Sequence, residues 1–359
     1  GGKILYAKNE KKLLIPASTL KVFTSLVAIH YLGENYRFET EFYLDPCENL
    51  KIKGYGDPMM ISEVVEEICG KIVSRINKRD IVINDIILDD SYYGRPLTIP
   101  GITSSTQPYD APNGGLCVNF NTVCFTRDPG AGTYLSAEPQ TPLLPIALRK
   151  IMKTGFRSGR IVFSHNENEI LMYAGDLFRY FLEQKGAKVR GQVIPGKVNR
   201  RTDYLLYKYR SKYKLHEIVE KLMTYSNNFT ANQLLIAAGA KVYGPPGNLE
   251  KGVRAAREFA KKELDIQNLR IKEGSGISRE NRVNASAMIK VLDSFAPFYR
   301  KMPSQNKVFF KTGTLHGIRT LAGYIETPNG NPHRFVIMKN SPGLPALAIL
   351  KKLLDLGCL

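Results

Sequence analysis

The stretch PASTLKVFTSLVAIHYLG, residues 16–33, decides much of the fold. It is mainly apolar from Leu20 to Leu32, with Pro16 before this run and Gly33 directly after it. Proline is favoured near the first turn of a helix and glycine just past the last turn. The stretch therefore predicts a buried helix that has Ser18 in its first turn.

Ser18 and Lys21 are three positions apart and would share one face of this helix. The Lys21 amine can then reach the Ser18 hydroxyl and accept its proton, because burial among apolar side chains disfavours the charged ammonium. Free backbone N–H groups in the first turn would stabilise an oxyanion beside Ser18. The pair predicts a serine nucleophile with a lysine base.

Two further motifs occur later in the chain, SNN at residues 226–228 and KTGT at residues 311–314. Taken singly, each motif has an ordinary explanation: Ser18 as a helix-start residue, Asn228 as a loop residue and Lys311 as a charge on an edge strand. All three in this order form the motif set of serine acyl-transfer enzymes. The combination is far more specific than any one of its parts.

The KTGT motif directly follows the apolar run 308–310. Strand-like runs at 321–325 and 334–338 are separated by the turn signal NGNP at 329–332. The pattern predicts an antiparallel sheet with the motif on one strand. Because Gly313 has no side chain, we expect a substrate backbone to lie against the strand edge there.

The three motifs resemble the active-site set of penicillin-binding proteins and class A β-lactamases. Beyond them the chain is similar to the low-molecular-mass class C penicillin-binding proteins, the D-Ala-D-Ala carboxypeptidase and endopeptidase family of serine peptidases. The segments that carry this wider resemblance are 2–6, 16–19, 54–58, 88–91, 274–276, 278–279 and 281–283. Asn227 stands where the family often has Asp, and Glu273 where Asp is usual.

The resemblance implies an α+β fold with a β-lactamase/transpeptidase-like domain, an antiparallel sheet flanked by helices. We expect residues 1–46 and 199–359 to form this discontinuous penicillin-binding domain. Far more residues separate Ser18 from Ser226 than Ser226 from Lys311. The segment between the first two motifs resembles the extra domain that this family carries at the same place. We therefore expect residues 47–198 to form an inserted mixed α/β domain.

The resemblance also implies roles for the motif residues. Ser18 attacks the penultimate D-Ala carbonyl, Lys21 takes the proton, and Ser226 relays a proton to the leaving amine. The backbone N–H groups of Ser18 and Thr314 form the oxyanion hole. The implied substrate-binding residues are Asn228, Lys311, Thr312, Gly313 and Thr314. The implied partners are peptidoglycan stem peptides and, as covalent inhibitors, β-lactam antibiotics; no cofactor is implied.

Two alternative functions remain open. One is a wall-binding scaffold with an inactive site, although the polar groups of all three motifs are present. The other is a β-lactamase-like hydrolase, for which we identify no equivalent of the deacylating glutamate of class A β-lactamases. A Ser-His-Asp hydrolase is disfavoured because the chain has no Gly-x-Ser-x-Gly elbow. His316 follows just after the third motif. We expect it to be an ordinary turn residue and not a substrate contact.

The 359 residues suffice for two domains with proper cores, and the net charge is +18. Basic residues interleaved with tyrosines at 207–214 are expected to form a solvated strand face and not a nucleic-acid site. The charge would suit peripheral contact with an anionic envelope, wall polymer or membrane surface. The resemblance implies an extracytoplasmic protein. Because the chain starts at Gly1 without Met, we expect that its leader is absent from this chain.

Five cysteines leave at least one thiol unpaired. Cys117 with Cys124, or Cys47 with Cys69, could form disulfides, and buried free thiols are an equal alternative. There is no Cys-x-x-Cys and no histidine-rich cluster, so a structural metal is not expected. The insert contains a cluster of two acidic and two aromatic residues: Asp89, Asp90, Tyr92 and Tyr93. A carboxylate of this cluster could hold the ammonium of a diamino acid side chain, or the four residues could serve only in turns and packing.

Overall fold

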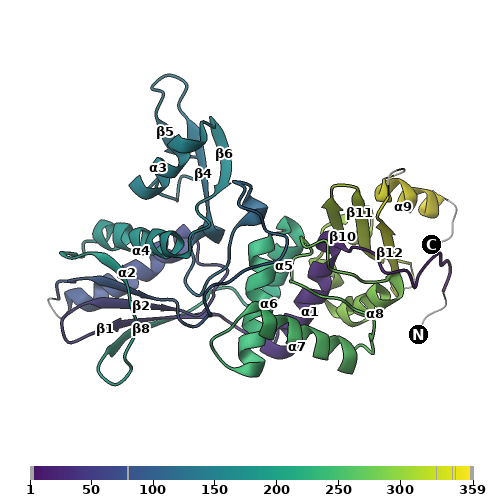
Figure 1. The fold of residues 1–359 in the computed structure, drawn as a ribbon, viewed down its shortest axis with the longest axis horizontal. Helices are drawn as coiled ribbons and strands as arrows, with labels where there is room; N and C mark the ends of the chain where they lie inside the picture. The colour runs from purple at the N-terminus through teal and green to yellow at the C-terminus, as the bar shows by residue number, and fades with distance from the viewer. Residues whose placement is uncertain (1–3, 79–80, 329, 342, 344, 356–359) are drawn as a thin grey trace.

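The computed structural model describes residues 4–78, 81–328, 330–341, 343 and 345–355. Gly2 and Lys3 of the family-like N-terminal segment, Asn329 of the predicted turn, and Cys358 lie outside the described residues. The chain forms two lobes with separate hydrophobic cores (Figure 1). We call residues 39–210 the inserted lobe and the remaining described residues the main lobe.

Helix α1 (Leu20–Leu32) runs through the core of the main lobe. A 3-10 turn, Ala17–Thr19, precedes it, so Ser18 lies just before α1 and not within its first turn as predicted. The helix ends at Gly33, whose φ of 90° is readily adopted only by glycine. The helix predicted from the apolar run is therefore present, with a tighter start.

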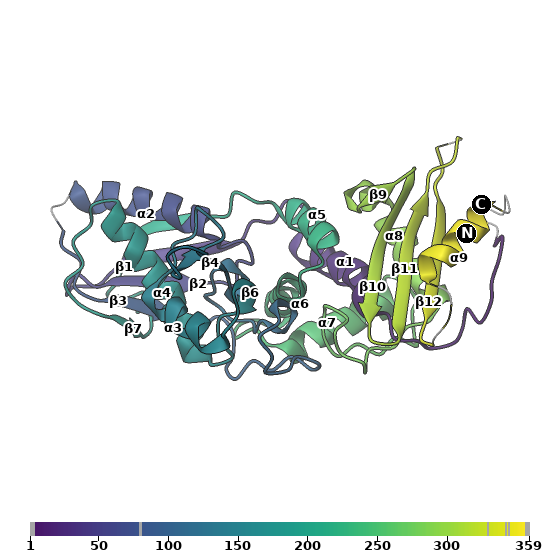
Figure 2. The same ribbon diagram turned by 90° about the horizontal axis from the view of Figure 1, so that it is seen from above.

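The main lobe is built on an antiparallel sheet with the strand order β12-β11-β10-β9. Side chains along β11 alternate between its two faces. Tyr324 packs with α8 and Leu321 packs with α9, so helices cover both faces (Figure 2). The bounds are β9 (Ser304–Gln305), β10 (Val308–Leu315), β11 (Ile318–Ile325), β12 (His333–Lys339), α8 (Ala285–Phe295) and α9 (Ala346–Asp355).

Three more helices pack around α1: α5 (Leu215–Tyr225), α6 (Asn228–Tyr243) and α7 (Leu249–Lys262). Helix α6 contributes an almost entirely buried face that includes Leu234 and Leu235. The prediction of an α+β fold with a helix-flanked antiparallel sheet is confirmed. No helix in the described part of the chain is long and apolar enough to cross a bilayer.

The inserted lobe contains a mixed five-stranded sheet with the order β7-β3-β2-β1-β8. Helices α2 and α4 cover one face, where Ile68 and Leu177 join a core with Phe42, Ile52 and Leu88 (Figure 1). The β2–β3 and β3–β7 pairs are parallel, and the other two are antiparallel. The bounds are β1 (Glu39–Leu44), β2 (Leu50–Gly54), β3 (Ile86–Asp89), β7 (Val193–Pro195), β8 (Tyr204–Arg210), α2 (Ser62–Asn77) and α4 (Glu167–Gln184).

A second, three-stranded sheet with the order β5-β4-β6 projects from this lobe together with α3 (Figure 1). Phe125 of β4 and Ile151 of α3 are fully buried and join the core of the inserted lobe. The projection is thus an extension of that core. The bounds are β4 (Thr122–Arg127), β5 (Tyr134–Ser136), β6 (Ser158–Val162) and α3 (Pro145–Thr154).

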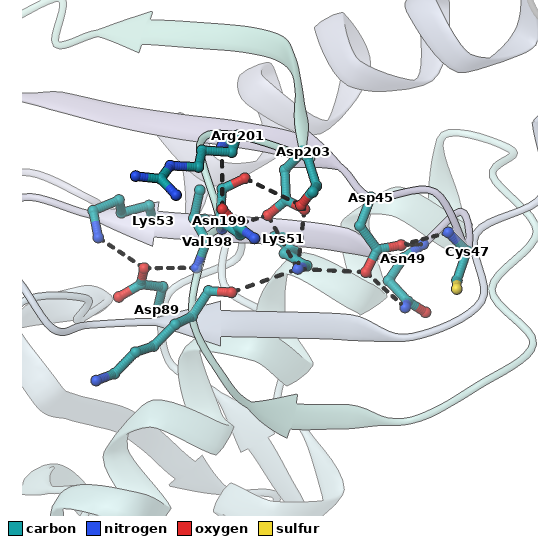
Figure 3. Close-up of polar contacts among 12 residues, drawn as sticks. Asp45, Cys47, Asn49, Lys51, Lys53, Asp89, Val198, Asn199, Arg201 and Asp203 are labelled. Carbon is teal, nitrogen blue, oxygen red and sulfur yellow. Dashed lines mark hydrogen bonds and ion pairs between the residues drawn. The ribbon is translucent and has the colours of Figure 1, made fainter.

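The segment between β7 and β8 is held against the larger sheet of the inserted lobe (Figure 3). Lys51 Nζ lies 3.0 Å from a carboxylate oxygen of Asp203, and Lys53 Nζ lies 2.7 Å from Asp89. The same Asp89 oxygen accepts the backbone N–H of Val198 at 3.0 Å. These largely buried charge-assisted bonds hold residues 196–203 against β2 and β3.

The domain bounds at 46/47 and 198/199 stay a prediction. Strands β1 and β8, which those bounds assign to the penicillin-binding domain, pair with each other and with the sheet of the inserted lobe. We propose bounds near 38/39 and 210/211, because strands of one sheet share one core and fold together.

Candidate active site

Lys21 lies at the centre of the motif residues and is fully buried. Its Nζ lies 3.0 Å from Ser18 Oγ, 2.7 Å from Asn228 Oδ1 and 2.7 Å from the Ser275 carbonyl oxygen. Ser18 and Lys21 meet through local helical spacing, whereas Asn228 comes from the first residue of α6 and Ser275 from a distant loop. The structure thus brings residues of the first and second motifs into direct contact.

These three contacts fit a neutral amine. Carbonyl oxygens only accept, so Asn228 and Ser275 take the two N–H bonds of a neutral Lys21 and leave its lone pair for the Ser18 hydroxyl proton. Burial, followed by the nearby charge of Lys311, lowers the pKa of Lys21 to about 7, and Glu273 opposes this shift. A base with a pKa near the working pH is suited to proton transfer.

The turn that carries Ser18 is held in a strained backbone conformation. Ala17 has a φ of 48°, in the left-handed region that non-glycine residues rarely adopt. A Cβ on Gly276 would lie 1.9 Å from the Ala17 carbonyl oxygen, so only glycine allows this approach. The Thr320 hydroxyl donates to the Pro16 carbonyl at 2.7 Å. Contacts from two distant segments therefore fix the position of the Ser18 backbone.

The second motif forms the junction between two helices. Ser226 ends α5 with a φ of 56°, and Asn227 caps α6 by accepting the Thr230 N–H at 2.9 Å. Asn caps a helix as well as Asp does, which explains how the chain tolerates this departure from the family pattern. The Asn228 amide also donates to the Tyr109 carbonyl of the inserted lobe at 3.0 Å. In the described chain, no hydrogen bond joins the Ser226 hydroxyl to Ser18 or Lys21.

The third motif lies on β10, as the sequence predicts. Lys311 is buried at 3% exposure, and burial lowers its pKa to about 8. Thr312 and Thr314 are exposed on the opposite face of the strand. Within the described residues, β9 pairs with β10 only at its start, so no strand covers the outer edge of β10 at 311–314.

Gly313 has a steric role that the sequence does not reveal. A Cβ there would lie 2.1 Å from Thr320 Oγ1, 2.8 Å from the Pro16 carbonyl oxygen and 3.0 Å from the Ser18 nitrogen. Glycine therefore lets β10 pack directly against the turn that carries Ser18. We expected glycine here because it leaves room for a substrate backbone. The contact with the Ser18 turn is enough to explain the glycine without that reason.

Glu273 organises the loop beside Lys21, a role that the sequence did not indicate. Its fully buried carboxylate accepts the backbone N–H groups of Ser275 at 2.6 Å and Gly276 at 2.7 Å. It also accepts the side-chain amide of Asn281 at 2.7 Å. This carboxylate holds the loop so that the Ser275 carbonyl points at Lys21. The glycines of the Glu-Gly-Ser-Gly segment were the signal of a tight loop.

Comparison with known proteins shows the family of this chain. A family model described as the D-Ala-D-Ala carboxypeptidase 3 (S13) family matches residues 1–159, 158–301 and 295–352. The chain belongs to this family. It is similar to a D-alanyl-D-alanine carboxypeptidase of Actinomadura sp. (strain R39), with 25% identity over 416 aligned positions that cover 96% of this chain and 77% of the relative. The predicted kinship with class C penicillin-binding proteins is confirmed.

Solved structures of two relatives share the fold of this S13 protein. Penicillin binding protein 4 of Haemophilus influenzae has a TM-score of 0.72 and 21% identity, covering 94% of this chain and 88% of that one. The second structure is a predatory endopeptidase of Bdellovibrio bacteriovorus, acylated by penicillin G and in complex with an immunity protein. It has a TM-score of 0.55 and 17% identity, and the match covers 98% of this chain and 87% of that one. Both likenesses extend over the two lobes.

The two acidic and two aromatic residues of the inserted lobe, at positions 89, 90, 92 and 93, already have contacts within the S13 protein. Asp89 is buried and paired with Lys53, and Asp90 is paired with Arg95. Tyr93 is buried, and the backbone of Tyr92 accepts from the Gly247 N–H. These contacts favour turn formation and packing over the recognition of a substrate ammonium.

Cys47, Cys69, Cys117 and Cys124 are free thiols, so neither of the two possible disulfides is formed. Burial raises the pKa of the Cys117 thiol to about 12, and that of Cys69 is raised as well. Among the described residues, no cluster of His, Cys, Asp or Glu could hold a metal ion. His316 lies in the exposed turn after β10, where its carbonyl accepts from Arg279 at 2.7 Å.

Proposed function

We propose that this chain is a serine-type D-Ala-D-Ala carboxypeptidase that acts on peptidoglycan stem peptides through an acyl-enzyme at Ser18. The three-way contact of buried Lys21 with Ser18, Asn228 and Ser275 is the observation that supports it most. An inactive scaffold would have no need to bury a lysine in a geometry that leaves its lone pair for the serine proton. Family membership supports the same activity.

In the proposed reaction, Ser18 Oγ attacks the carbonyl carbon of the penultimate D-Ala while Lys21 takes the hydroxyl proton. The backbone N–H groups of Ser18 and Thr314 stabilise the oxyanion. The C–N bond breaks as Ser226 passes the proton to the leaving amine. Water then hydrolyses the ester, which releases the acyl group and returns the proton to Ser18.

Substrate binding is assigned to Asn228 and the exposed edge of β10. Asn228 orients Lys21 and the substrate amide, and Gly313 keeps the strand against the nucleophile. Lys311, Thr312 and Thr314 bind the carboxylate of the leaving residue. An endopeptidase substrate has such a carboxylate too, on the D-centre of its cross-linked diamino acid, so endopeptidase activity is a second candidate function for the same site.

We further propose that β-lactam antibiotics acylate Ser18 and that the protein works outside the cytoplasm, where stem peptides are located. The penicillin G acyl-enzyme of the Bdellovibrio endopeptidase supports the first point. The net charge of +18 supports contact with an anionic envelope or membrane surface.

The carboxylate assignment predicts a preference for peptides with a free C-terminal acid. Lys311→Ala should lower kcat/KM for an acyl-D-Ala-D-Ala peptide about 10- to 100-fold, because it removes a charge-assisted bond in a buried site. The C-terminal amide of the same peptide should be a poor substrate for both enzymes. Lys307→Ala, an exposed lysine just before β10, is the matched control and should act as the unaltered protein. Equal rates on acid and amide by the unaltered enzyme would reopen the choice of substrate.

The two lysines predict a bell-shaped pH profile for kcat/KM. Activity should rise as the pH increases through about 7, where Lys21 loses its proton and becomes a base. It should fall as the pH increases above about 8, where Lys311 loses the charge that binds the carboxylate. Steady-state rates on the acid peptide across this range test both limbs. A profile that stays flat through pH 7 would contradict the role of Lys21.

A further inference from the structure

A strongly basic hollow lies on the main lobe, outside the residues assigned to the reaction. It is open to solvent, has a volume of about 340 Å³ and is lined by four cationic side chains and one carboxylate: Arg257, Arg270, Lys272, Arg282 and Glu280. A hollow of this size is within the range of small-molecule sites, which begins at about 300 Å³. The reaction proposed for Ser18 uses none of these five side chains.

The backbone forces two of these cations together. Arg270 and Arg282 are directly opposite each other in an isolated antiparallel bridge, with N–O distances of 2.9 Å and 2.8 Å in the two directions. Like charges in such a position repel each other. Arg257 approaches from α7, where its guanidinium donates to the Ile271 carbonyl at 3.1 Å. The cations are therefore gathered by the fold at an electrostatic cost.

Protein carboxylates do not balance this charge. Glu280 pairs with Lys272 at 3.2 Å. In the described part of the chain, Arg257, Arg270 and Arg282 form no ion pair with a carboxylate. Three guanidinium groups thus share one hollow whose single lining carboxylate, Glu280, is paired with Lys272.

We propose that this hollow binds a phosphate ester or pyrophosphate group. The planar guanidinium fork matches phosphate oxygens with paired hydrogen bonds. A phosphate monoester carries about −1.5 to −2 charge at neutral pH, which suits three unpaired arginines better than the single charge of a carboxylate. The bound group would belong either to a lipid headgroup or to a soluble phosphate compound.

Titration calorimetry with pyrophosphate at fixed ionic strength tests the site. Arg257→Gln/Arg270→Gln should weaken binding by about tenfold or more, because charged hydrogen bonds are lost. Glu280→Gln should tighten binding, because it removes the only carboxylate of the lining. The control Arg149→Gln/Arg201→Gln removes the same charge from exposed arginines of the inserted lobe and should bind as the unaltered protein.

Vesicle sedimentation distinguishes the two sources of phosphate. Capture by phosphatidylcholine vesicles that contain phosphatidic acid, lost in Arg257→Gln/Arg270→Gln, assigns the site to a lipid headgroup. Pyrophosphate binding without such capture assigns it to a soluble phosphate compound. Penicillin labelling should be unchanged in all variants, which shows that each of them still folds. The proposal is wrong if the unaltered protein binds neither probe, or if the control variant weakens binding as much as the pocket variant.

Discussion

Ser18→Ala is expected to abolish both peptide hydrolysis and covalent labelling by penicillin. The alanine variant keeps the backbone turn but has no oxygen to attack a carbonyl or to hold an acyl group. Removal of the Ser18 hydroxyl leaves the packing of Pro16, Gly276 and Thr320 around this turn intact. Intact-mass spectrometry after incubation with penicillin measures the adduct directly.

Ser25→Ala is the matched control, because Ser25 lies on α1, which directly follows the turn of Ser18, and its buried hydroxyl donates to the Lys21 carbonyl at 2.8 Å. Its loss should lower the free energy of unfolding by about 1 kcal/mol and leave penicillin labelling in place. An adduct that persists on Ser18→Ala would remove Ser18 as the nucleophile. Loss of labelling in both variants would point to helix damage, which the melting temperature would reveal.

The parts of the site that depend on local periodicity were predictable. Ser18 and Lys21 meet because residues three apart share a helix face, and KTGT lies on a strand because apolar runs flank it. Both of these features depend on residues that are close to one another in the chain. The fold class followed from the family resemblance that the three motifs and their flanking segments carry.

Contacts between distant segments could not be predicted from the pattern. The Ser275 carbonyl that accepts from Lys21 is 254 positions away in the chain. The sequence showed Glu273 only as a departure from the Asp that is usual in the family, whereas in the structure its carboxylate holds that carbonyl in place. The sequence left open whether Asp89 holds a substrate ammonium or serves in a turn, because its partner, Lys53, comes from a neighbouring strand whose register the sequence does not give.

Domain bounds were hard to place for the same reason. A boundary chosen from motif spacing divides the chain in sequence, whereas a core is defined by which strands pair. The alternation in β1 puts Phe42 in the core of the inserted lobe, although β1 follows α1 of the main lobe after a short connection. Only strand pairing shows which of two adjacent cores an apolar strand joins.

Substitution of Lys21 separates a base from a charge that only orients the substrate. Lys21→Arg keeps a cation with several donors, but a guanidinium does not lose its proton in proteins and so has no lone pair for the Ser18 proton. Lys21→Met fills much of the same buried volume without charge or donors. If Lys21 is the base, both variants should be acylated by penicillin about 10²- to 10⁴-fold more slowly.

Lys311→Arg is the matched control, since a second cation in the same site should still bind a carboxylate and should keep most of the acylation rate. We therefore expect that replacing lysine by arginine greatly lowers the acylation rate at position 21 but changes it little at position 311. Stopped-flow or quenched acylation assays at pH values on both sides of 7 give the rates. Because Asn228 and Ser275 lose their donor in Lys21→Met, its melting temperature must be measured beside its rate. Rapid acylation of folded Lys21→Arg at neutral pH would show that another group, with Ser226 as the first candidate, removes the proton.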